Sequence, residues 1–448
     1  MAGLILLFIS IYFFLQRKYT FSILIFFLFV TNGFQIIPSE VLTLGLPLDK
    51  ASDYGLLYVL IISWMRRKYL SAIFKAFPIF RLVIYLLIFV IISALYSILI
   101  LNYSTTNVVQ VLRPYLFFLS FIVFASVPIK YLIDVFHKIT ILTIFQCSLF
   151  LLQIVVGKSL LFSSSGGEAT ISVLEGAGYT RFYNAPVFHK VAFFYLLFVR
   201  KFDNPTKQIL GLSILALTIV GPLHRSTIMS MVIVLSIYVL LRQGSAKRFL
   251  YISGIGILSY IISFVDIISN RIDEAFFDIQ NTFSSNLTVQ SIDISANTSL
   301  FRIGHFLERF NYIIQSPEQW IFGIGLISDN ASYAAKLPFQ FGLVSEINNQ
   351  VIQIDTGDLI WSPLILNLGI AGTILYAFIF IKFLLFFYSR IDFSKYATIG
   401  FLSILSALII SVTGTEMISH QFRIMILLIA VIVYKQSNLA AMNKRTVQ

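Results

Sequence analysis

Long apolar runs separated by short clusters of lysine and arginine make up most of this 448-residue chain. Of its residues, 58% are hydrophobic and only 12% are charged, which is more apolar surface than a soluble domain can bury. Repeated runs of this kind are typical of membrane-spanning helices, because a helix satisfies its backbone hydrogen bonds internally. The sequence therefore predicts an all-α fold, a polytopic transmembrane helical bundle.

Hydropathy predicts about 12 membrane spans. Several apolar runs are shorter than the roughly 20 residues of a perpendicular span, so their helices extend into flanking residues or are broken. The candidate spans are Leu4 to Leu15, Phe21 to Ile37, Tyr54 to Met65, Leu82 to Leu101, Pro114 to Val127, Leu132 to Val156, Pro186 to Val199, Ile209 to Pro222, Ser226 to Leu241, Phe249 to Ile268, Asp358 to Phe387, Ala397 to Val412 and Ile418 to Tyr434.

One long polar interruption, from Asn270 to Thr356, divides the apolar pattern. We therefore expect N-terminal transmembrane helices over 1–269, a large loop over 270–356, C-terminal transmembrane helices over 357–434 and a tail over 435–448. Inside the loop, residues 300–315 have the spacing of an amphipathic helix.

Basic residues predict the orientation of the chain. If Arg17 and Lys18 are cytoplasmic, strict alternation also places the strong clusters at 66–68, 200–207 and 242–248 in the cytoplasm, as the positive-inside rule expects. The C-terminal tail then lies inside and the long loop lies outside. For a bacterium, this topology means a multi-pass inner (plasma) membrane protein with a periplasmic loop.

Arginines outnumber lysines on the expected outer side. A guanidinium presents a planar fork that can bind phosphate oxygens with two hydrogen bonds, whereas lysine offers a mobile point charge. The outer face therefore indicates phosphate recognition, with ordinary loop residues that pair with carboxylates as the alternative. The outer cations are Arg113, Arg181, Arg225, Arg271, Arg302, Arg309, Arg423, Lys50, Lys158, Lys190 and Lys336.

The sequence lacks the motifs of several other function classes. Its one cysteine, Cys147, lies in an apolar run and indicates packing. No His or Cys cluster has metal-ligand spacing, and neither a P-loop nor a dinucleotide-binding glycine pattern is present. We expect no metal and no cofactor. The net charge of +12 reflects membrane topology, so no nucleic-acid partner is expected.

Candidate substrate-binding residues precede two of the expected spans. Arg181 and His189 would form part of a basic and aromatic rim, which is also the pattern of an ordinary membrane interface. Arg225 lies at the tight Gly221 to Thr227 junction between two apolar runs. Ionisable residues at membrane depth are costly and usually line a cavity, so Arg225 is a site candidate.

The amphipathic stretch in the loop carries Arg302, His305 and Arg309. The two arginines are seven positions apart and share a helix face, with the histidine close to it. This face either binds substrate or lies against lipid headgroups. The following Gly323-Ile324-Gly325 allows a close backbone approach.

The loop closes on Asp355 and Asp358, at the start of the eleventh expected span. A carboxylate here can take a proton from an acceptor hydroxyl, for which Asp355 is the first choice, before Asp358 and His305. The alternative is a helix cap, which Asp commonly provides.

The order of these features resembles the bacterial O-antigen polymerase and O-antigen ligase superfamily of membrane glycosyltransferases. The matching elements are the Arg225-Ser226 junction, the Arg302 helix running to Trp320 and Gly323-Ile324-Gly325, and Asp355 to Gly372. They cover residues 209–390, and their order carries more weight than any single motif.

The resemblance implies a helical bundle partly roofed by the loop and a donor glycan on undecaprenyl pyrophosphate. Arg225 and Arg302 match the basic residues that hold the pyrophosphate, which makes them and Asp355 the catalytic candidates. Arg113, Arg181, His189, His305, Arg309, Asp358 and Arg423 are the substrate-binding candidates. A chain-length regulator and a flippase are the implied protein partners, beside membrane lipid.

Two alternatives stay open. Ligases carry a histidine where the long loop meets the next helix, and this chain has Asp355-Thr356-Gly357-Asp358 there, which favours a polymerase over a ligase that transfers glycan to lipid A core. A lipid-linked sugar flippase or transporter would show internal repeats or paired broken helices, and no repeat is evident.

Overall fold

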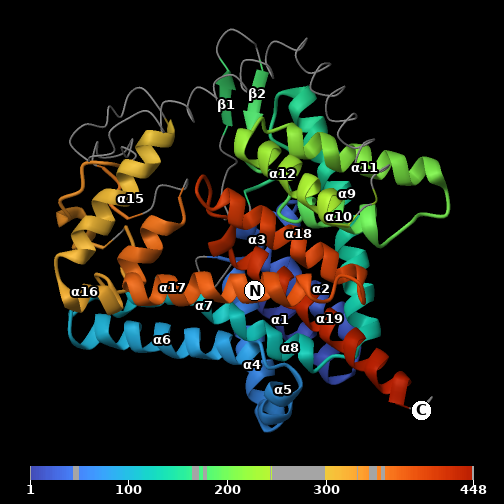
Figure 1. Ribbon diagram of the computed structural model, residues 1–448, viewed down its shortest axis with the longest axis horizontal. Coiled ribbons are helices and arrows are strands. Elements are labelled where there is room, and N and C mark those ends of the chain that lie inside the picture. The colour runs from blue at the N-terminus through green and yellow to red at the C-terminus, as the bar shows by residue number, and fades with distance from the viewer. Residues whose placement is uncertain are drawn as a thin grey trace.

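A computed structural model describes residues 2–43, 50–163, 171–174, 179–242, 244, 298–329, 331–342, 351–354 and 359–445. The chain is mostly helical, at 76%, which confirms the predicted fold class at this level. Within the described residues, the strands β1 (Ile171–Leu174) and β2 (Tyr179–Phe182) form one antiparallel hairpin, with Ile171 opposite Phe182. In Figure 1 this hairpin and the helix α15 lie on the upper side of the molecule.

In the N-terminal half, short helices and 3₁₀ turns (η) lie between the long helices. In chain order the elements are α1 (Ala2–Leu15), α2 (Tyr19–Val30), η1 (Gly33–Gln35), α3 (Ser39–Thr43), α4 (Ser52–Met65), η2 (Arg67–Tyr69), α5 (Leu70–Ala76), α6 (Phe80–Leu99), α7 (Thr105–Leu116), η3 (Phe117–Leu119), α8 (Ser120–Ala125), α9 (Ile129–Val156), α10 (His189–Phe198), α11 (Pro205–Val220) and α12 (Arg225–Arg242).

The described C-terminal part begins within the expected loop. Its elements are α15 (Thr298–Ile314), α16 (Pro317–Phe322), η5 (Ala334–Lys336), α17 (Trp361–Tyr388), α18 (Lys395–Ile410), η6 (Glu416–Ile418) and α19 (His420–Arg445).

Six helical segments of the described chain are long and apolar enough to cross a membrane. They are α6, the combined Thr105–Ala125, α9, α12, α17 and the His420–Leu439 part of α19. The helices α1, α2, α4, α10, α11 and α18 are apolar but shorter. The chain is thus a helical protein with several candidate spans, while the number 12 and the size of the outer loop stay predictions. The expected span Phe249 to Ile268 lies outside the described residues.

One expected span begins at the wrong residue. Hydropathy places its start at Pro114, but α7 begins at Thr105 and contains Pro114. The polar residues of the first turns, among them Asn107 and Gln110, hide this start from a hydropathy window. Pro114 lacks a backbone N–H, and soon after it the chain tightens into η3 before continuing as α8.

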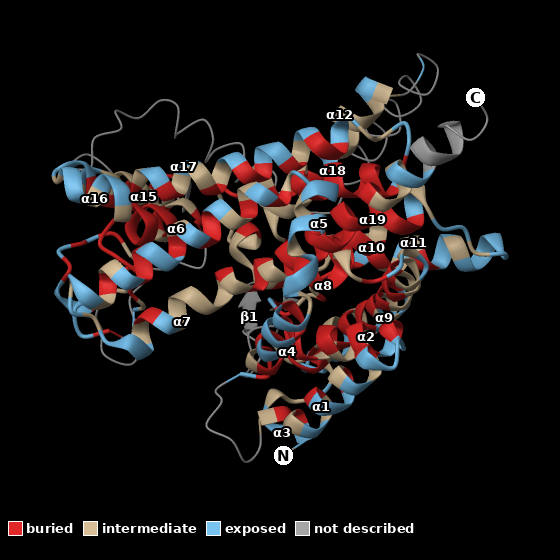
Figure 2. Ribbon diagram, turned by 90° about the horizontal axis from the view of Figure 1, so that it is seen from below, coloured by how far each residue is buried: buried red, intermediate tan, exposed pale blue. Residues whose placement is uncertain are grey.

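The core lies where α2, α9, α18 and α19 meet, as Figure 2 shows by the concentration of buried residues there. Aromatic rings extend the core to the neighbouring helices: Phe80 of α6 stacks on Phe121 of α8 with ring centroids 4.6 Å apart, and Phe386 of α17 stacks on Tyr434 of α19 at 4.5 Å. Offset rings of this kind pack tightly without polar partners. Exposed residues gather instead on outward faces such as those of α1 and α6.

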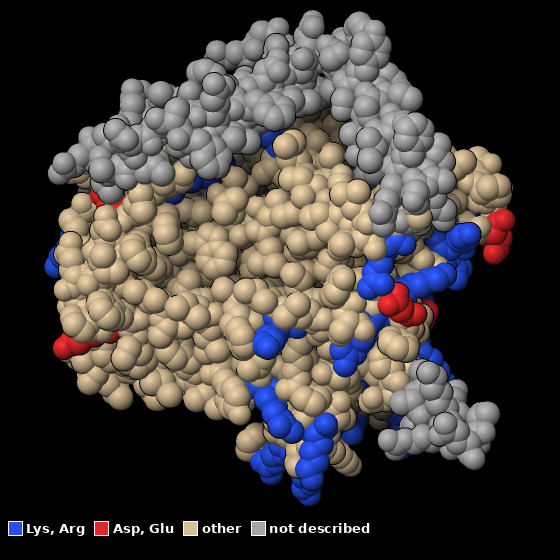
Figure 3. Space-filling view, viewed as in Figure 1, with Lys and Arg blue, Asp and Glu red and all other residues tan. Residues whose placement is uncertain are grey.

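In the view of Figure 3, cationic side chains gather over α5 at the lower edge and beside the start of α11 at the right, and a broad surface to the left of both carries few charges. Arg67 and Lys68 just before α5, and Lys201 and Lys207 around the start of α11, belong to the clusters that the sequence places in the cytoplasm. A broad surface with few charges suits a protein whose sides face lipid.

The predicted amphipathic helix is present as α15, and the glycine turn after α16 makes the predicted close backbone approach. Gly323 has a φ of 62°, and the Ile324 N–H donates to the Leu366 carbonyl at 2.7 Å. Gly369, with a φ of 65°, interrupts α17 on the facing side. The two glycines let α16 and α17 touch through their backbones, which fixes α15 and α16 against the bundle.

We predict that Gly323→Ala destabilises the protein more than Gly157→Ala does. Gly157 has a left-handed helical backbone (φ 71°, ψ 14°), where alanine adds about 1 to 2 kcal/mol of strain, whereas Gly323 (φ 62°, ψ −146°) lies in a region that essentially only glycine adopts. A Cβ at position 323 would also lie 1.9 Å from the Leu366 carbonyl oxygen, whereas one at 157 meets nothing within 4 Å. Melting temperatures of the purified variants measure the difference. Equal losses would show that the α16 and α17 contact is not tight.

Candidate functional site

Contacts between distant segments define one end of the bundle, which we call the loop end. The Leu326 N–H donates to Ser97 Oγ at 2.8 Å, which joins the described loop to the end of α6. Trp361, the first residue of α17, donates through its indole to Ser411 Oγ at 3.2 Å, just after α18. Lys190 at the start of α10 pairs with Glu416 of η6. Of the residues that join these segments, Lys190 was predicted from the sequence to face outward.

Arg423 is an arginine buried in the bundle near the loop end, with 1% of its surface exposed. Its Nη2 donates to the Ile418 carbonyl at 2.7 Å, and its guanidinium carbon lies 5.0 Å from the centre of the Phe118 ring and 5.4 Å from that of Tyr115. Nη1 has no hydrogen-bond partner among the described residues. No carboxylate of the described chain forms an ion pair with Arg423, so ring faces and carbonyls alone balance its charge.

The Arg423 side chain also shapes the turn before α19. Its Nε donates to the Ser419 carbonyl at 3.4 Å, while the Tyr376 hydroxyl of α17 donates to the Met417 carbonyl at 2.6 Å. These bonds satisfy carbonyls that the break between α18 and α19 leaves without helical partners. The turn that carries Glu416 is therefore held from two helices.

Lys190 and Glu416 form an ion pair between α10 and η6, with side-chain exposures of 10% and 22%. His189 precedes the lysine, is buried, and has its Nδ1 2.5 Å from the Pro186 carbonyl oxygen. The structure thus brings the predicted His189 to the same end as Arg423.

Arg181 lies beside the junction that carries Arg225. Its Nε donates to the Pro222 carbonyl at 3.1 Å, and its guanidinium lies over the ring of Tyr183. Tyr183 in turn contacts the His224 ring edge to face at 5.2 Å. Arg225 is the first residue of α12 and is half-buried. Only four residues separate α11 from α12, as the sequence predicts for this junction, and Arg181, Tyr183 and His224 gather beside it.

Arg113 already has a carboxylate partner. Its Nη1 lies 2.9 Å from both oxygens of Asp53, which links α7 to the start of α4. A substrate phosphate would therefore have to compete with Asp53 for this guanidinium.

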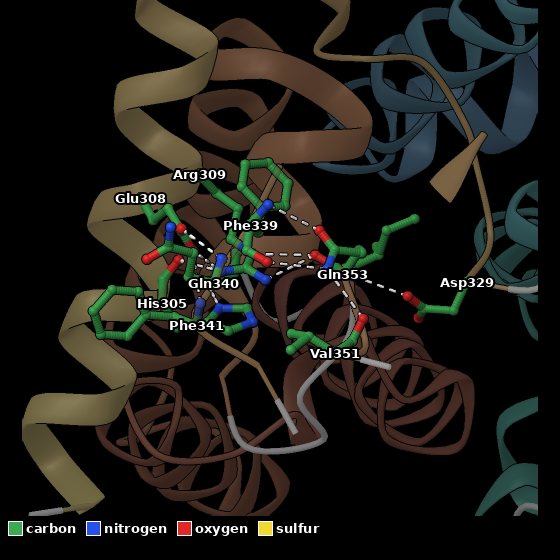
Figure 4. A network of polar contacts seen from close by, with 11 residues as sticks. His305, Glu308, Arg309, Asp329, Phe339, Gln340, Phe341, Val351 and Gln353 are labelled. Atoms are coloured by element: carbon green, nitrogen blue, oxygen red, sulfur yellow. Dashed lines mark hydrogen bonds and ion pairs between the residues drawn. The ribbon is translucent and has the colours of Figure 1, made fainter. Parts of the chain in front are cut away.

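The polar face of α15 is turned into the protein (Figure 4). Arg309 is fully buried, and both its Nε and Nη2 donate to the Gln353 carbonyl, at 3.2 and 2.9 Å. Its Nη1 donates to Glu308 at 2.9 Å, and the guanidinium stacks on Phe339 at 4.4 Å. Burial lowers the pKa of Arg309 to about 10, which leaves it charged at neutral pH.

These contacts give Arg309 a structural role, which the sequence did not predict. Its donors are bonded to protein groups, so in this arrangement it fastens the 351–354 segment to α15 instead of facing an open site. The Gln353 side chain continues the connection, because its amide accepts from the Phe339 N–H at 3.0 Å and donates to the Phe339 carbonyl at 3.1 Å.

His305 lies one helical turn before Arg309 and is also fully buried. Its Nδ1 is 2.8 Å from Ser362 Oγ at the start of α17, and its Nε2 has no hydrogen-bond partner among the described residues. Burial, with a smaller effect of the nearby Arg309 charge, lowers the pKa of His305 to about 2. The imidazole is neutral at physiological pH and cannot act as a cation toward phosphate.

Arg302 is half-buried on α15, one turn N-terminal to His305. Asp355 and Asp358 lie outside the described residues, so their assignment stays a prediction. No group of His, Cys, Asp and Glu that could hold a metal ion occurs in the described parts of the chain.

Sequence reasoning missed Glu416 and Gln353. Glu416 stands in the short polar turn Thr413-Gly414-Thr415-Glu416 between two apolar runs, a signal that marks a helix connection but not a site. The role of Gln353 depends on tertiary contacts alone. No protein-family model matches this chain, and no curated protein matches it either.

We predict that Glu308→Gln loosens the loop segment that Arg309 holds. Glu308 accepts the backbone N–H groups of Gln340 at 2.7 Å and Phe341 at 3.1 Å as well as the Arg309 guanidinium. Losing charge-assisted bonds of this kind costs about 1.5 to 3 kcal/mol, so the Gln340 and Phe341 amides should exchange about tenfold faster or more. Hydrogen exchange read by mass spectrometry measures this.

The control for this experiment is Glu318→Gln, which removes an exposed carboxylate of α16. It should leave exchange in the 339–342 segment unchanged. Unchanged exchange in Glu308→Gln as well would mean that the carboxylate does not hold this segment.

Proposed function

We propose that this protein is a metal-independent membrane glycosyltransferase that joins oligosaccharide repeat units carried on undecaprenyl pyrophosphate. The product would be an O-antigen, capsular or exopolysaccharide chain, made at the outer face of a bacterial inner membrane. The proposal combines the resemblance to O-antigen polymerases with the cationic groups at the loop end.

The observation that carries the proposal is the buried guanidinium of Arg423. An arginine inside a bundle is costly without an anionic partner, and no carboxylate of the described residues pairs with it. Its Nη1 is left with an unused donor capacity. A diphosphate bound at the loop end would provide the missing negative charge, and Arg181 and Arg225 are the further cationic candidates from the sequence.

The chemistry suits a site rich in arginine. Pyrophosphate is already a capable leaving group, so catalysis needs cations where negative charge develops more than it needs an acid to protonate the leaving oxygen. Arginine keeps its charge at any physiological pH and can bind two phosphate oxygens at once. The sequence assigns the proton-accepting base to Asp355, which lies outside the described residues.

One experiment separates this function from its alternatives. The purified protein is incubated with a lipid-linked repeat unit, with and without lipid A core as acceptor. A polymerase makes a ladder of long products without the core, a ligase makes a single transfer that requires it, and a flippase makes neither. A missing ladder with intact lipid-linked substrate would end the proposal.

We predict that Arg225→Ala and Arg302→Ala each abolish long polysaccharide chains while the protein stays at normal abundance in the membrane. Each charge-assisted contact contributes about 1.5 to 3 kcal/mol, so losing one should slow transfer by about tenfold to over a hundredfold. Product ladders on gels measure the effect.

Arg67→Ala is the matched control for these two variants. Arg67 lies in a basic cluster expected in the cytoplasm, and its guanidinium stacks on Trp64 at 4.0 Å. Its ladder should equal that of the wild-type protein. Normal ladders in both Arg225→Ala and Arg302→Ala would remove these arginines from the site.

The proposed orientation predicts that Lys336→Cys reacts with an impermeant maleimide added outside spheroplasts, whereas Lys395→Cys reacts only after permeabilisation. Both lysines are exposed, and they lie on opposite sides in the expected topology. The native Cys147 is fully buried, which keeps the background low. Labelling of Lys395→Cys in intact cells would reverse the orientation.

A further inference from the structure

We infer that Glu416 is the catalytic base that takes the proton from the acceptor hydroxyl, and that Lys190 is its positioning residue. The inference rests on the proposed function and adds to it a residue that the sequence did not single out. It follows from the surroundings of each carboxylate at the loop end and from the rigidity of the turn that carries Glu416.

The other described carboxylates on this side hold protein segments together through their hydrogen bonds or lie on the open surface. Both oxygens of Asp53 contact Arg113, and both oxygens of Glu308 accept hydrogen bonds from α15 and the loop. Asp329 accepts the Ile354 N–H at 2.8 Å. Glu40 and Glu318 are exposed, where water would compete for any proton transfer.

Glu416 differs from them in two ways. Lys190 contacts one carboxylate oxygen, Oε2, while the described residues give Oε1 no hydrogen-bond partner. The side chain is 22% exposed, so it is shielded and still reachable from the loop end. A carboxylate with one held oxygen and one available oxygen can accept a proton in a fixed direction.

The turn around Glu416 is held rigidly. Tyr376 from α17 and Arg423 from α19 bind the Met417 and Ile418 carbonyls, at 2.6 and 2.7 Å. The Gln421 side chain donates to the Val30 carbonyl of α2 at 3.2 Å. A base on a braced turn loses little reorganisation energy when it reacts. Arg423, whose guanidinium is proposed to bind the diphosphate, thus bonds to a carbonyl two residues after Glu416.

The reaction balances without any added reagent. The acceptor oxygen bonds to the anomeric carbon as the bond from that carbon to the diphosphate oxygen breaks, and the bonding pair leaves with the diphosphate. Glu416 takes the hydroxyl proton through Oε1. A carboxylate is basic enough for this step, as it is in inverting glycosidases, where a carboxylate activates the incoming water. Direct displacement of this kind inverts the anomeric centre.

The test uses the purified full-length protein and a lipid-linked repeat unit. Glu416→Gln keeps the shape of the side chain but cannot accept the proton, so we expect kcat to fall by about 100- to 10,000-fold with little change in KM. Asp392→Asn is the matched control, because it removes the carboxylate of the Arg242 pair at the far ends of α12 and α17. Its kcat should be unchanged.

A charge-swapped variant, Lys190→Glu with Glu416→Lys, tests whether Glu416 is a catalytic base or only part of a structural ion pair. The swap restores an ion pair between α10 and η6, so a purely structural pair predicts recovered polymer formation. If Glu416 is the catalytic base, the swapped variant should have a normal melting temperature but should not recover polymer formation. Nuclear magnetic resonance of the product linkage should show inversion relative to the donor.

The outcomes also separate this inference from the function on which it rests. If the wild-type protein makes no polymer, the proposed function fails. If the wild-type protein makes polymer, then normal kcat in Glu416→Gln, recovery in the swapped variant, or retention at the anomeric centre overturns the inference alone. Asp355→Asn ranks the two candidate bases: a near-normal Glu416→Gln beside a crippled Asp355→Asn would return the role to Asp355.

Discussion

An apolar bundle gives its polar groups no water, so each one must find a partner inside the protein, and this constraint organises the loop end. The break between α18 and α19 exposes carbonyls that Arg423 and Tyr376 bind. Further from it, Gln153 of α9 donates to Asn184 Oδ1 at 2.7 Å and accepts the Leu161 N–H at 3.1 Å. In this bundle, long polar side chains thus form the hydrogen bonds with free backbone groups that water forms at the surface of a soluble protein. The turns at the loop end keep fixed shapes for that reason.

The same constraint divides the arginines into two groups. Arg309 and Arg113 have protein partners that use their donors, and they hold segments together. Arg423 is buried, and its Nη1 has no hydrogen-bond partner among the described residues. A shared residue type therefore does not mean a shared role. An anionic ligand would find an unused cationic donor at Arg423.

The sequence predicted those structural features that depend on residues close together in the chain. The 3.6-residue period predicted α15, because it depends on neighbouring residues alone. The two glycines around Ile324 predicted that a backbone could approach closely there, but not that the partner would be Leu366 of α17. The period could not tell which face of α15 turns inward, so the burial of Arg309 was not foreseen. The pair of Lys190 with Glu416 joins residues 226 positions apart. Only the packing of α10, α18 and α19 brings them together, and no pattern in one sequence encodes that contact.

The titration behaviour of these groups bears on how a diphosphate site could work. Burial keeps His305 neutral at physiological pH, with a pKa of about 2, so it adds no charge that would vary with acidity. Arg309 stays protonated despite a pKa lowered to about 10. The positive charge on α15 then comes from its arginines and not from His305. If a carboxylate serves as the base, its protonation sets the acid limb of the rate profile, while binding of the diphosphate should stay nearly independent of pH.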